Sequence, residues 1–350
     1  MLFEVRPVDR QVYDGHLRDW LPDPIIDVHT HVWLDRFKAG AADAPRRTVT
    51  WPARVALDNS VEDLLETYRL MLPGRRVLPL CFSNLTLGDD MDAANAYVAK
   101  SARAHGLPAL IFASPQWSGY ELERRIIGGG FIGAKVYLTL ADPAIPAREI
   151  RIFDYLPHHQ LAMLDRHRWI VMLHIPRDDR LKDPLNLAQM LEIERRYPHV
   201  QVVIAHVGRA YCAGDVGRAF DVLAETKRMA FDISANTNAE VFELLIRAVG
   251  PQRILFGSDM PILRMRMRRV CEEGRYINLV PGGLYGDVSG DRNMREVDPP
   301  ESERLTFFLY EELLAFKRAA EATGLSREDL EAVFYRNATR MIEAAGLRTT

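Results

Sequence analysis

Two histidines lie two residues apart in the segment Asp27-Val28-His29-Thr30-His31, which directly follows an apolar pair. Because side chains alternate between the two faces of a β-strand, both imidazoles would point the same way and could share one metal ion. Three later apolar runs also end in a side chain that can bind a metal. Imidazole nitrogen and carboxylate oxygen are typical zinc ligands. The pattern predicts one divalent metal ion, with Zn²⁺ preferred, bound by His29, His31, His174 and Asp259.

Such a centre would activate water. A divalent ion lowers the pKa of a bound water to about 7, so a metal-bound hydroxide becomes available at neutral pH. Asp259 is the preferred general base, because a carboxylate that touches both the ion and the water can take its proton. His206, which ends another apolar run, is expected beside the water or the substrate oxygen, with direct metal binding as the second choice. Asp27 is expected to orient a neighbouring histidine.

Apolar runs alternate with longer amphipathic stretches. Strands are predicted at 25–29, 77–82, 109–113, 132–137, 169–174, 201–206, 228–233 and 253–258. Helices are predicted at 60–72, 90–104, 119–127, 152–166, 185–196, 214–225 and 238–249. This alternation is typical of an α/β fold with a buried parallel sheet. Ligands at the ends of distant strands favour a (β/α)8 TIM barrel with the metal at its carboxyl-terminal face. An open doubly wound sheet is disfavoured, since no glycine-rich phosphate turn follows the first strand.

The remaining segments are assigned to the same single domain, residues 1–350. Residues 1–24 form an N-terminal lead-in, and residues 34–59 form a long first loop. Residues 260–300 form a second long insertion rich in Arg, Gly and Pro. Residues 301–345 are predicted to form two terminal helices, with Ser326 as an N-cap. Both long loops follow strand ends, where lids and substrate contacts lie in a barrel.

Composition narrows the class of protein. The chain has 350 residues, 48% of them hydrophobic, and a formal net charge of -3. This balance suits a globular enzyme and gives no reason to expect nucleic acid or a membrane as partner. No stretch reaches membrane-spanning length, and the N-terminus lacks the apolar region of a signal peptide. Cys81, Cys212 and Cys271 show no paired spacing and fit a reducing compartment, so a cytoplasmic protein is expected. The sequence is compatible with a homo-oligomer and does not determine the oligomeric state.

Cationic and aromatic residues near the strand ends are candidates for substrate binding. Arg177 and Arg209 each follow a candidate site histidine by three residues, and either could instead pair with Asp178 or Asp215. Four arginines between 264 and 269 would either attract an anion or form a solvated face paired with Glu272 and Glu273. A small anionic substrate is therefore expected, because arginine binds carboxylates with charge-assisted hydrogen bonds. The candidate contacts are Lys135, Arg177, Arg209, Tyr137, Trp33 and Arg264, with Arg177 and Lys135 preferred.

The ordered set of motifs resembles the amidohydrolase superfamily, and its flanking residues resemble the amidohydrolase 2 branch. The matching segments are Ile26-Asp27-Val28-His29-Thr30-His31, Ala205-His206-Val207-Gly208, Leu255-Phe256-Gly257-Ser258-Asp259-Met260-Pro261 and Phe334-Tyr335-Arg336-Asn337-Ala338. The resemblance spans about residues 25–345 and implies a TIM barrel with one divalent metal ion. It carries the ligand role to His29, His31, His174 and Asp259, with His206 as the catalytic partner. In other branches a fourth-strand lysine is carboxylated and bridges two metals, which is the alternative role for Lys135.

The resemblance implies hydrolases of lactones or amides, alongside non-oxidative decarboxylases of aromatic or muconate-type acids. The leading hypothesis is a hydrolase of a small carboxylated cyclic ester or amide, in which His206 stabilises the oxyanion. A metal-dependent decarboxylase is the alternative, because both reactions use the same ligands. A binding protein on a barrel relic is the third hypothesis, which the intact ligand set opposes.

Overall fold

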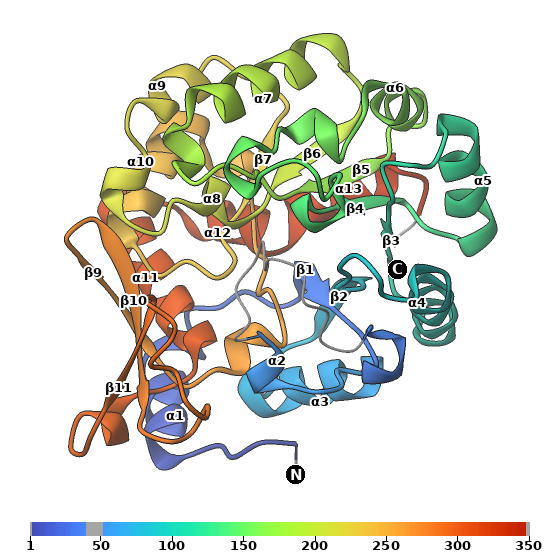
Figure 1. The fold of residues 1–350 in the computed structure, drawn as a ribbon. Helices are drawn as coiled ribbons and strands as arrows, with labels where there is room; N and C mark the ends of the chain where they lie inside the picture. Colours follow the sequence, from blue (N-terminus) through green and yellow to red (C-terminus); the bar gives the residue numbers. More distant parts are fainter. Residues whose placement is uncertain (1, 40–51, 348–350) are drawn as a thin grey trace.

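The structure is a computed structural model that describes residues 2–39 and 52–347 (Figure 1). Parallel pairing joins β1 to β2 and joins β3 through β8 in chain order. The strands are β1 (Ile25–His31), β2 (Val77–Phe82), β3 (Ile111–Phe112), β4 (Gly133–Val136), β5 (Ile170–Leu173), β6 (Gln201–Ile204), β7 (Ala230–Asp232) and β8 (Ile254–Leu255). Each predicted strand is present, although most are shorter than predicted.

Two sets of backbone contacts join these strands into a closed barrel. A parallel bridge between Cys81 and Ala109 connects β2 to the segment that leads into β3. On the other side, Thr30 bridges Met260, and the N–H of His31 donates to the Met260 carbonyl at 2.8 Å. The ring of strands therefore has no open edge at either join, and the predicted (β/α)8 TIM barrel is confirmed over the open sheet.

Helices follow the strands and surround the barrel (Figure 1). The main ones are α3 (Val61–Met71), α4 (Met91–His105), α5 (Gly119–Gly129), α6 (His158–Arg166), α7 (Pro184–Arg196), α9 (Ala219–Leu223) and α10 (Ala239–Val249). Their starts follow from the local sequence, because the side chains of Ser60, Asp183 and Asn238 accept N–H groups of the first turns of α3, α7 and α10. The short helix α2 (Pro52–Val55) lies in the first loop.

Two predicted helices are divided in the structure. The prediction over 152–166 resolves into a 3-10 turn at Ile152–Asp154 and α6, because Pro157 lacks an N–H and disfavours a helical residue before it. The prediction over 214–225 resolves into a turn at Ala213–Asp215 and α9. Gly217, with a φ of 52°, lies between these two elements and interrupts the helix.

Segments from both ends of the chain lie together. Helix α1 (Pro7–Val12) continues into a π-helical turn at Tyr13–Leu17, and the Tyr13 ring stacks on Tyr310 of α11 (Phe308–Thr323) at 6.0 Å between centroids. Helix α12 (Arg327–Glu331) begins at Ser326, whose hydroxyl accepts the N–H of Asp329 at 3.1 Å, as predicted. A π-helical turn at Ala332–Arg336 joins it to α13 (Asn337–Ala344), so the two predicted terminal helices are confirmed.

The second insertion is a small sheet rather than the predicted loop. It contains β9 (Arg268–Glu272), β10 (Arg275–Pro281) and β11 (Met294–Val297), with β10 in the middle (orange in Figure 1). Strands β9 and β10 pair antiparallel across Glu273 and Gly274, whose φ angles are 50° and 75°. Positive φ at both central residues is the geometry of a tight hairpin turn, and a glutamate at the first of these positions is not a usual sequence signal for it.

The insertion leaves and re-enters the main body at one place. The N–H of Met267 donates to the Thr306 carbonyl at 3.0 Å, and the N–H of Phe308 donates to the Met265 carbonyl at 2.7 Å. Between them, the buried guanidinium of Arg266 binds both carboxylate oxygens of Asp9 at 2.9 and 2.6 Å. These contacts fasten the base of the insertion to the N-terminal lead-in.

A disulfide between Cys212 and Cys271 corrects the prediction from cysteine spacing. The pair is 59 residues apart and joins the loop after β6 to β9 of the insertion, whereas Cys81 is free and buried. Only tertiary contact brings the two cysteines together, so linear spacing carried no signal. With two of the three cysteines in a disulfide, cysteine content no longer supports a reducing compartment.

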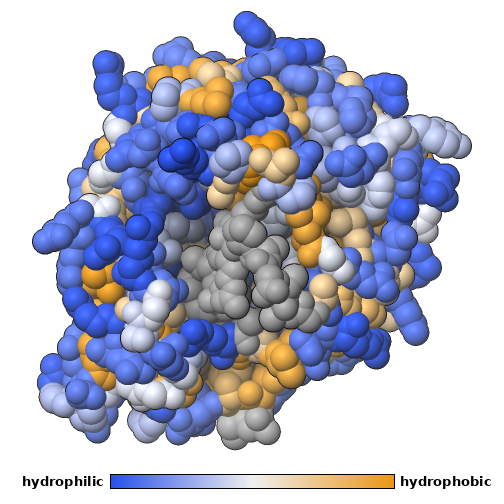
Figure 2. All heavy atoms as spheres, in the orientation of Figure 1, coloured by the Kyte–Doolittle hydropathy of each residue, from blue (hydrophilic) through white to orange (hydrophobic). Residues whose placement is uncertain are grey.

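The surface is mixed in character. Figure 2 shows hydrophilic residues over most of the visible face, with apolar residues in separate patches. Within residues 2–39 and 52–347, the helices are all too short or too polar to cross a bilayer.

Candidate active site

Strand β1 places both of its histidines inside the barrel, where their rings are held by different oxygen atoms. Nδ1 of His29 lies 2.8 Å from Oδ2 of Asp232, and Nδ1 of His31 lies 3.0 Å from the Ser83 carbonyl. Because a carbonyl only accepts, Nδ1 of His31 must carry a proton, so Nε2 is the ring nitrogen that could bind a metal ion. The Nε2 atoms of His29 and His31 lie 3.5 and 3.1 Å from Oδ1 of Asp259.

Asp259 follows β8 and faces these rings in an uncommon backbone conformation. Its φ is 56°, and its N–H donates to the His29 carbonyl at 2.7 Å. Positive φ at a non-glycine residue costs energy and persists where surrounding contacts enforce it, often at functional sites. Burial acts to raise the pKa of Asp259, but His206, His31 and His29 outweigh it and lower that pKa to about 2. The carboxylate is therefore ionised.

His206 follows β6 and also has a positive φ, 58°. Its N–H donates to Oδ1 of Asp232 at 2.8 Å, and its Nδ1 lies 2.9 Å from Oγ and 3.2 Å from the carbonyl of Ser234. Candidate ligand atoms of His29, His206 and Asp259 all lie within 4.8 Å of one another. Within the described ranges, this group has the geometry to hold a metal ion. It contains His206 and lacks two of the predicted ligands, His31 and His174.

His174 follows β5 and completes the ring cluster. Its ring lies 5.3 Å from that of His206 and 4.7 Å from that of Tyr137. Its buried Nδ1 has no hydrogen-bond partner among the described residues. Buried polar atoms are normally paired, so an orphaned imidazole nitrogen fits a residue that serves a ligand role. Donor types, fixed tautomers and this orphaned atom together fit a divalent ion.

Burial sets the charge of the cluster. It lowers the pKa of His29, His174 and His206, which favours the neutral imidazole that binds metals. Lys135 on β4 is also buried, and burial lowers its pKa to about 8. Its Nζ lies 3.5 Å from Nε2 of His29, so Lys135 belongs to the centre itself.

Sequence reasoning missed the acid that organises the cluster. Asp232 ends β7 and contacts both His29 and His206, and the hydroxyl of Ser234 donates to it. The signal was present, since an acid at the end of a predicted barrel strand has the same placement as His174. Asp27 has the supporting position that the sequence suggested, because Oδ1 accepts the N–H groups of His29 and Ser258. Burial raises the pKa of Asp27 to about 7.

Some of the residues predicted to bind substrate already pair with an acid, and others do not. Arg177 donates from Nε to Asp183 at 2.9 Å, so its partner is neither of the two acids considered from the sequence. Arg209 donates from Nη1 to the carbonyls of Ile175, Pro176 and Arg177, and it forms no ion pair within the described residues. Arg209 therefore keeps an uncompensated charge near His174, where it lowers that imidazole's pKa after the larger effect of burial.

The other aromatic and cationic candidates lie in different surroundings. Tyr137 lies against His174, whereas the indole of Trp33 is buried and donates to the Leu57 carbonyl at 2.8 Å. Arg264 is also buried, donates to Asn59 and to the Asp63 carbonyl, and has its pKa lowered by burial to about 10. These contacts hold Trp33 and Arg264 within the protein framework.

The arginine run after Asp259 is not a solvated face, and that expectation is wrong. Arg264, Arg266 and Arg269 are buried, and only Arg268 is half exposed. Glu272, one of the expected partners, pairs with Arg295 at 2.7 Å instead. Each buried guanidinium has at least one acceptor 34 or more residues away in the chain, which residue spacing could not reveal.

The fold and the site define a barrel enzyme with a metal-competent centre of histidine and aspartate at the strand ends. The sequence matches the family described as Amidohydrolase over residues 26–275, and the chain belongs to the amidohydrolase family. The resemblance drawn from its motifs is confirmed. No curated protein matches the chain.

Solved structures share the fold at low identity. A dihydroxybenzoic acid decarboxylase from Polaromonas, solved with manganese and 2-nitroresorcinol, is 16% identical with a TM-score of 0.56, over 92% of this chain and 97% of that one. A probable 2-pyrone-4,6-dicarboxylic acid hydrolase from Acinetobacter baumannii is 15% identical with a TM-score of 0.55, over 91% and 99%. An amidohydrolase 2 from Bifidobacterium longum subsp. infantis is 16% identical with a TM-score of 0.53, over 92% and 99%. The neighbours thus include both hydrolases and decarboxylases.

Proposed function

We propose that the protein is a metal-dependent hydrolase that opens a small carboxylated cyclic ester or amide. The observation that carries this proposal is the convergence of His29 and His31 Nε2 on one carboxylate oxygen of Asp259. Imidazoles and a carboxylate that converge in this way form a donor set for a divalent ion, and Zn²⁺ is the proposed ion. When bound, the ion supplies an acidified water and polarises the substrate carbonyl.

The chain's own residues would move the proton. A carboxylate with a pKa of about 2 is a weak base alone, so Asp259 is suited to take a proton only from an acidified donor and to return it to the leaving group. In His206, the carbonyl of Ser234 fixes the proton on Nδ1, so Nε2 is an acceptor. We therefore assign His206 to metal binding or proton acceptance, in place of the oxyanion contact first expected.

Arg209 is the proposed site for the substrate carboxylate. Its charge is uncompensated within the described residues, while Arg177 is neutralised by Asp183 and Lys135 lies against His29. A guanidinium with free donors binds a carboxylate strongly and with defined orientation. The proposed partner is thus a small anionic molecule, with neither nucleic acid nor membrane, and the cytoplasmic location stays a prediction.

The test combines metal analysis with product identification. The purified protein is analysed for bound zinc and manganese and then assayed with lactones, cyclic amides and aromatic acids, including 2-pyrone-4,6-dicarboxylate and 2,6-dihydroxybenzoate. A ring-opened acid supports hydrolysis, whereas released carbon dioxide with an intact ring would replace the proposal with decarboxylation. Metal binding without turnover of either substrate class would contradict both enzyme assignments.

A further inference from the structure

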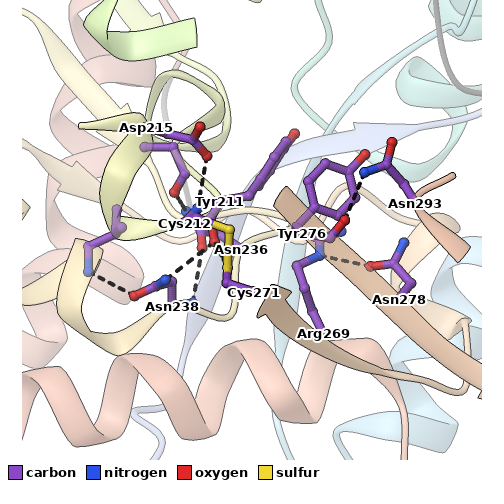
Figure 3. The surroundings of a disulfide bond; sticks show 12 residues. Tyr211, Cys212, Asp215, Asn236, Asn238, Arg269, Cys271, Tyr276, Asn278 and Asn293 are labelled. Carbon is purple, nitrogen blue, oxygen red and sulfur yellow. Dashed lines mark hydrogen bonds between the residues drawn. A yellow bond between two sulfur atoms is a disulfide. The ribbon is translucent and has the colours of Figure 1, made fainter. Parts of the chain in front are cut away.

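Two tyrosines from different segments lie together beside the centre. Tyr211 lies in the loop after β6, five residues beyond His206, and Tyr276 lies on β10 of the insertion. Their ring centroids are 5.0 Å apart with an edge-on geometry, and Tyr276 is only 6% exposed. Figure 3 shows the oxygen atoms of both rings on the same side, pointing away from Cys271.

Two guanidinium groups lie over both rings. Arg269 lies 4.7 Å from the centroid of Tyr211 and 4.6 Å from that of Tyr276, and Arg180 lies 5.3 and 5.2 Å from the same centroids. Cations at these distances interact with the π-electrons of the rings. Two cations at this place favour an anionic ligand over a neutral one.

These hydroxyls differ from those of other buried tyrosines. The hydroxyls of Tyr68, Tyr155 and Tyr310 donate to Asp27, to the His174 carbonyl and to the Met71 carbonyl. By contrast, the hydroxyls of Tyr211 and Tyr276 make no hydrogen bond with any described residue. Neither hydroxyl is among the buried side-chain atoms that lack a partner, so both oxygens are reachable and available to a ligand.

Several contacts place the tyrosine pair next to the predicted catalytic residues. Arg269 donates from Nη1 to the carbonyl of Ala235, which directly follows Ser234 of the centre. Asn236 donates to the carbonyl of Ala210 at 2.7 Å and so fixes the backbone beside Tyr211. Burial and the neighbouring Tyr276 raise the pKa of Tyr211 to about 12, and the nearby charge of Arg209 acts against this effect. The pair therefore borders the region where the substrate carboxylate is proposed to bind.

The disulfide fastens the two halves of this pair. Cys212 directly follows Tyr211, and Cys271 is paired with Tyr276 across the β9–β10 hairpin. A covalent link at this point fixes the distance between the two rings (Figure 3). Precise spacing of two donors is what recognition of one ligand group requires.

We propose that Tyr211 and Tyr276 form a specificity-determining wall whose two hydroxyls bind a second carboxylate of the substrate, at its end remote from the metal. This inference rests on the proposed function and narrows its substrate to dicarboxylates. Arg209 then binds one acid group near the centre, and the wall selects molecules that carry another. Monocarboxylates lack the second group and bind more weakly.

The test measures binding to the zinc-loaded protein by calorimetry, with isophthalate as a dicarboxylate probe and benzoate as its monocarboxylate analogue. The wild type is expected to bind isophthalate at least about tenfold more tightly than benzoate. Tyr211→Phe and Tyr276→Phe keep the stacked rings and should each lower isophthalate affinity about tenfold, because each removes a hydrogen bond to a charged group. Benzoate affinity should not change. Tyr120→Phe, at a position that is 75% exposed, is the matched control.

The outcomes separate this inference from the proposed function. Equal losses for isophthalate and benzoate would mean that the hydroxyls act through structure, and absent isophthalate binding or unchanged affinities in both variants would overturn the wall. If the expected binding pattern is found but lactones and amides are not opened, the wall stands and the hydrolase assignment falls. If lactones or amides are opened but the expected binding pattern is absent, only the proposed role of Tyr211 and Tyr276 is rejected.

Discussion

The metal-competent centre and the β9–β11 insertion are built on different principles. In the centre, side chains at the ends of barrel strands hold one another, as Asp232 holds both His29 and His206. The insertion lies outside the barrel and is held by the Asp9–Arg266 ion pair and the Cys212–Cys271 disulfide. The barrel thus fixes the chemical groups within a rigid ring of strands, whereas an added sheet brings Tyr276 to the same place from outside.

The sharpest test of this division is Asp259→Asn. The substitution should lower kcat by at least about a hundredfold, because it removes the general base, while the insertion and its disulfide stay intact. Turnover is compared with that of Asp221→Asn, an exposed acid that pairs with Arg218. A near-normal rate in Asp259→Asn would show that another group takes the proton.

Removal of the disulfide that holds the insertion should lower stability and leave the metal-competent centre intact. Replacement of both Cys212 and Cys271 by serine should lower the free energy of unfolding by about 2–4 kcal/mol, since the crosslink no longer restricts the unfolded chain. Zinc affinity should change little, because no centre residue loses a contact. The check is denaturant unfolding together with metal titration, with Cys81→Ser as a contrasting variant of a free buried cysteine. A parallel loss of zinc affinity would contradict the separation of the two regions.

Asp232→Asn should damage the centre without touching the insertion. It removes the carboxylate that orients two imidazoles, and loss of such supporting contacts typically costs about 10- to 100-fold in metal affinity. Competition with a chromophoric chelator measures the effect, and the thermal unfolding midpoint of the metal-free protein reports any general damage. Unchanged affinity would mean that Ser234 alone orients His206.

Arg209→Met tests the border between the two regions. It should lower kcat/KM for an anionic substrate about tenfold, because one charge-assisted contact is lost, and should spare the neutral ester of that substrate. Arg177→Met is the matched control, since Arg177 already pairs with Asp183. Equal losses for acid and ester would assign Arg209 a structural role.

Glu312 lies behind both regions and gives the smallest expected effect. It is buried on α11, both carboxylate oxygens lack a partner among the described residues, and burial, with Asp27, Asp232 and Asp259, raises its pKa well above the usual range. Burial lowers the pKa of the nearby Arg269, and the charge of Glu312 acts against this effect. A carboxyl whose pKa is raised in the folded state favours folding below about pH 4.3 and loses this contribution as the pH rises. Glu312→Met should therefore be more stable than the wild type by about 1 kcal/mol at pH 8, with a smaller advantage near pH 4.

Denaturant unfolding at several pH values measures this difference. An advantage for Glu312→Met that grew toward acid pH would contradict the sign and show that Glu312 is ionised in the folded protein.

Features set by local sequence patterns could be predicted, whereas contacts between residues far apart in the sequence could not. The eight strands and the placement of His29, His31, His174 and Asp259 at their ends followed from local apolar runs and from the barrel topology. Asp232 also lies at the end of a predicted strand, so the same local pattern could have identified it. The disulfide and the pairing of Arg266 with Asp9 depend on contacts between residues 59 and 257 positions apart, and no local pattern encodes them.

The base of the insertion has a consequence for how substrate range could change in evolution. Its two ends are held together by the Met267–Thr306 and Phe308–Met265 hydrogen bonds, so the chain leaves and returns at one point of the barrel. When both ends of a segment are already adjacent, its length can vary at small entropic cost to the rest of the fold. Residues 268–305 therefore form an insertion that could be exchanged, lengthened or deleted with little effect on the barrel. Such a change would alter the selectivity for substrates and leave the metal-competent centre unchanged.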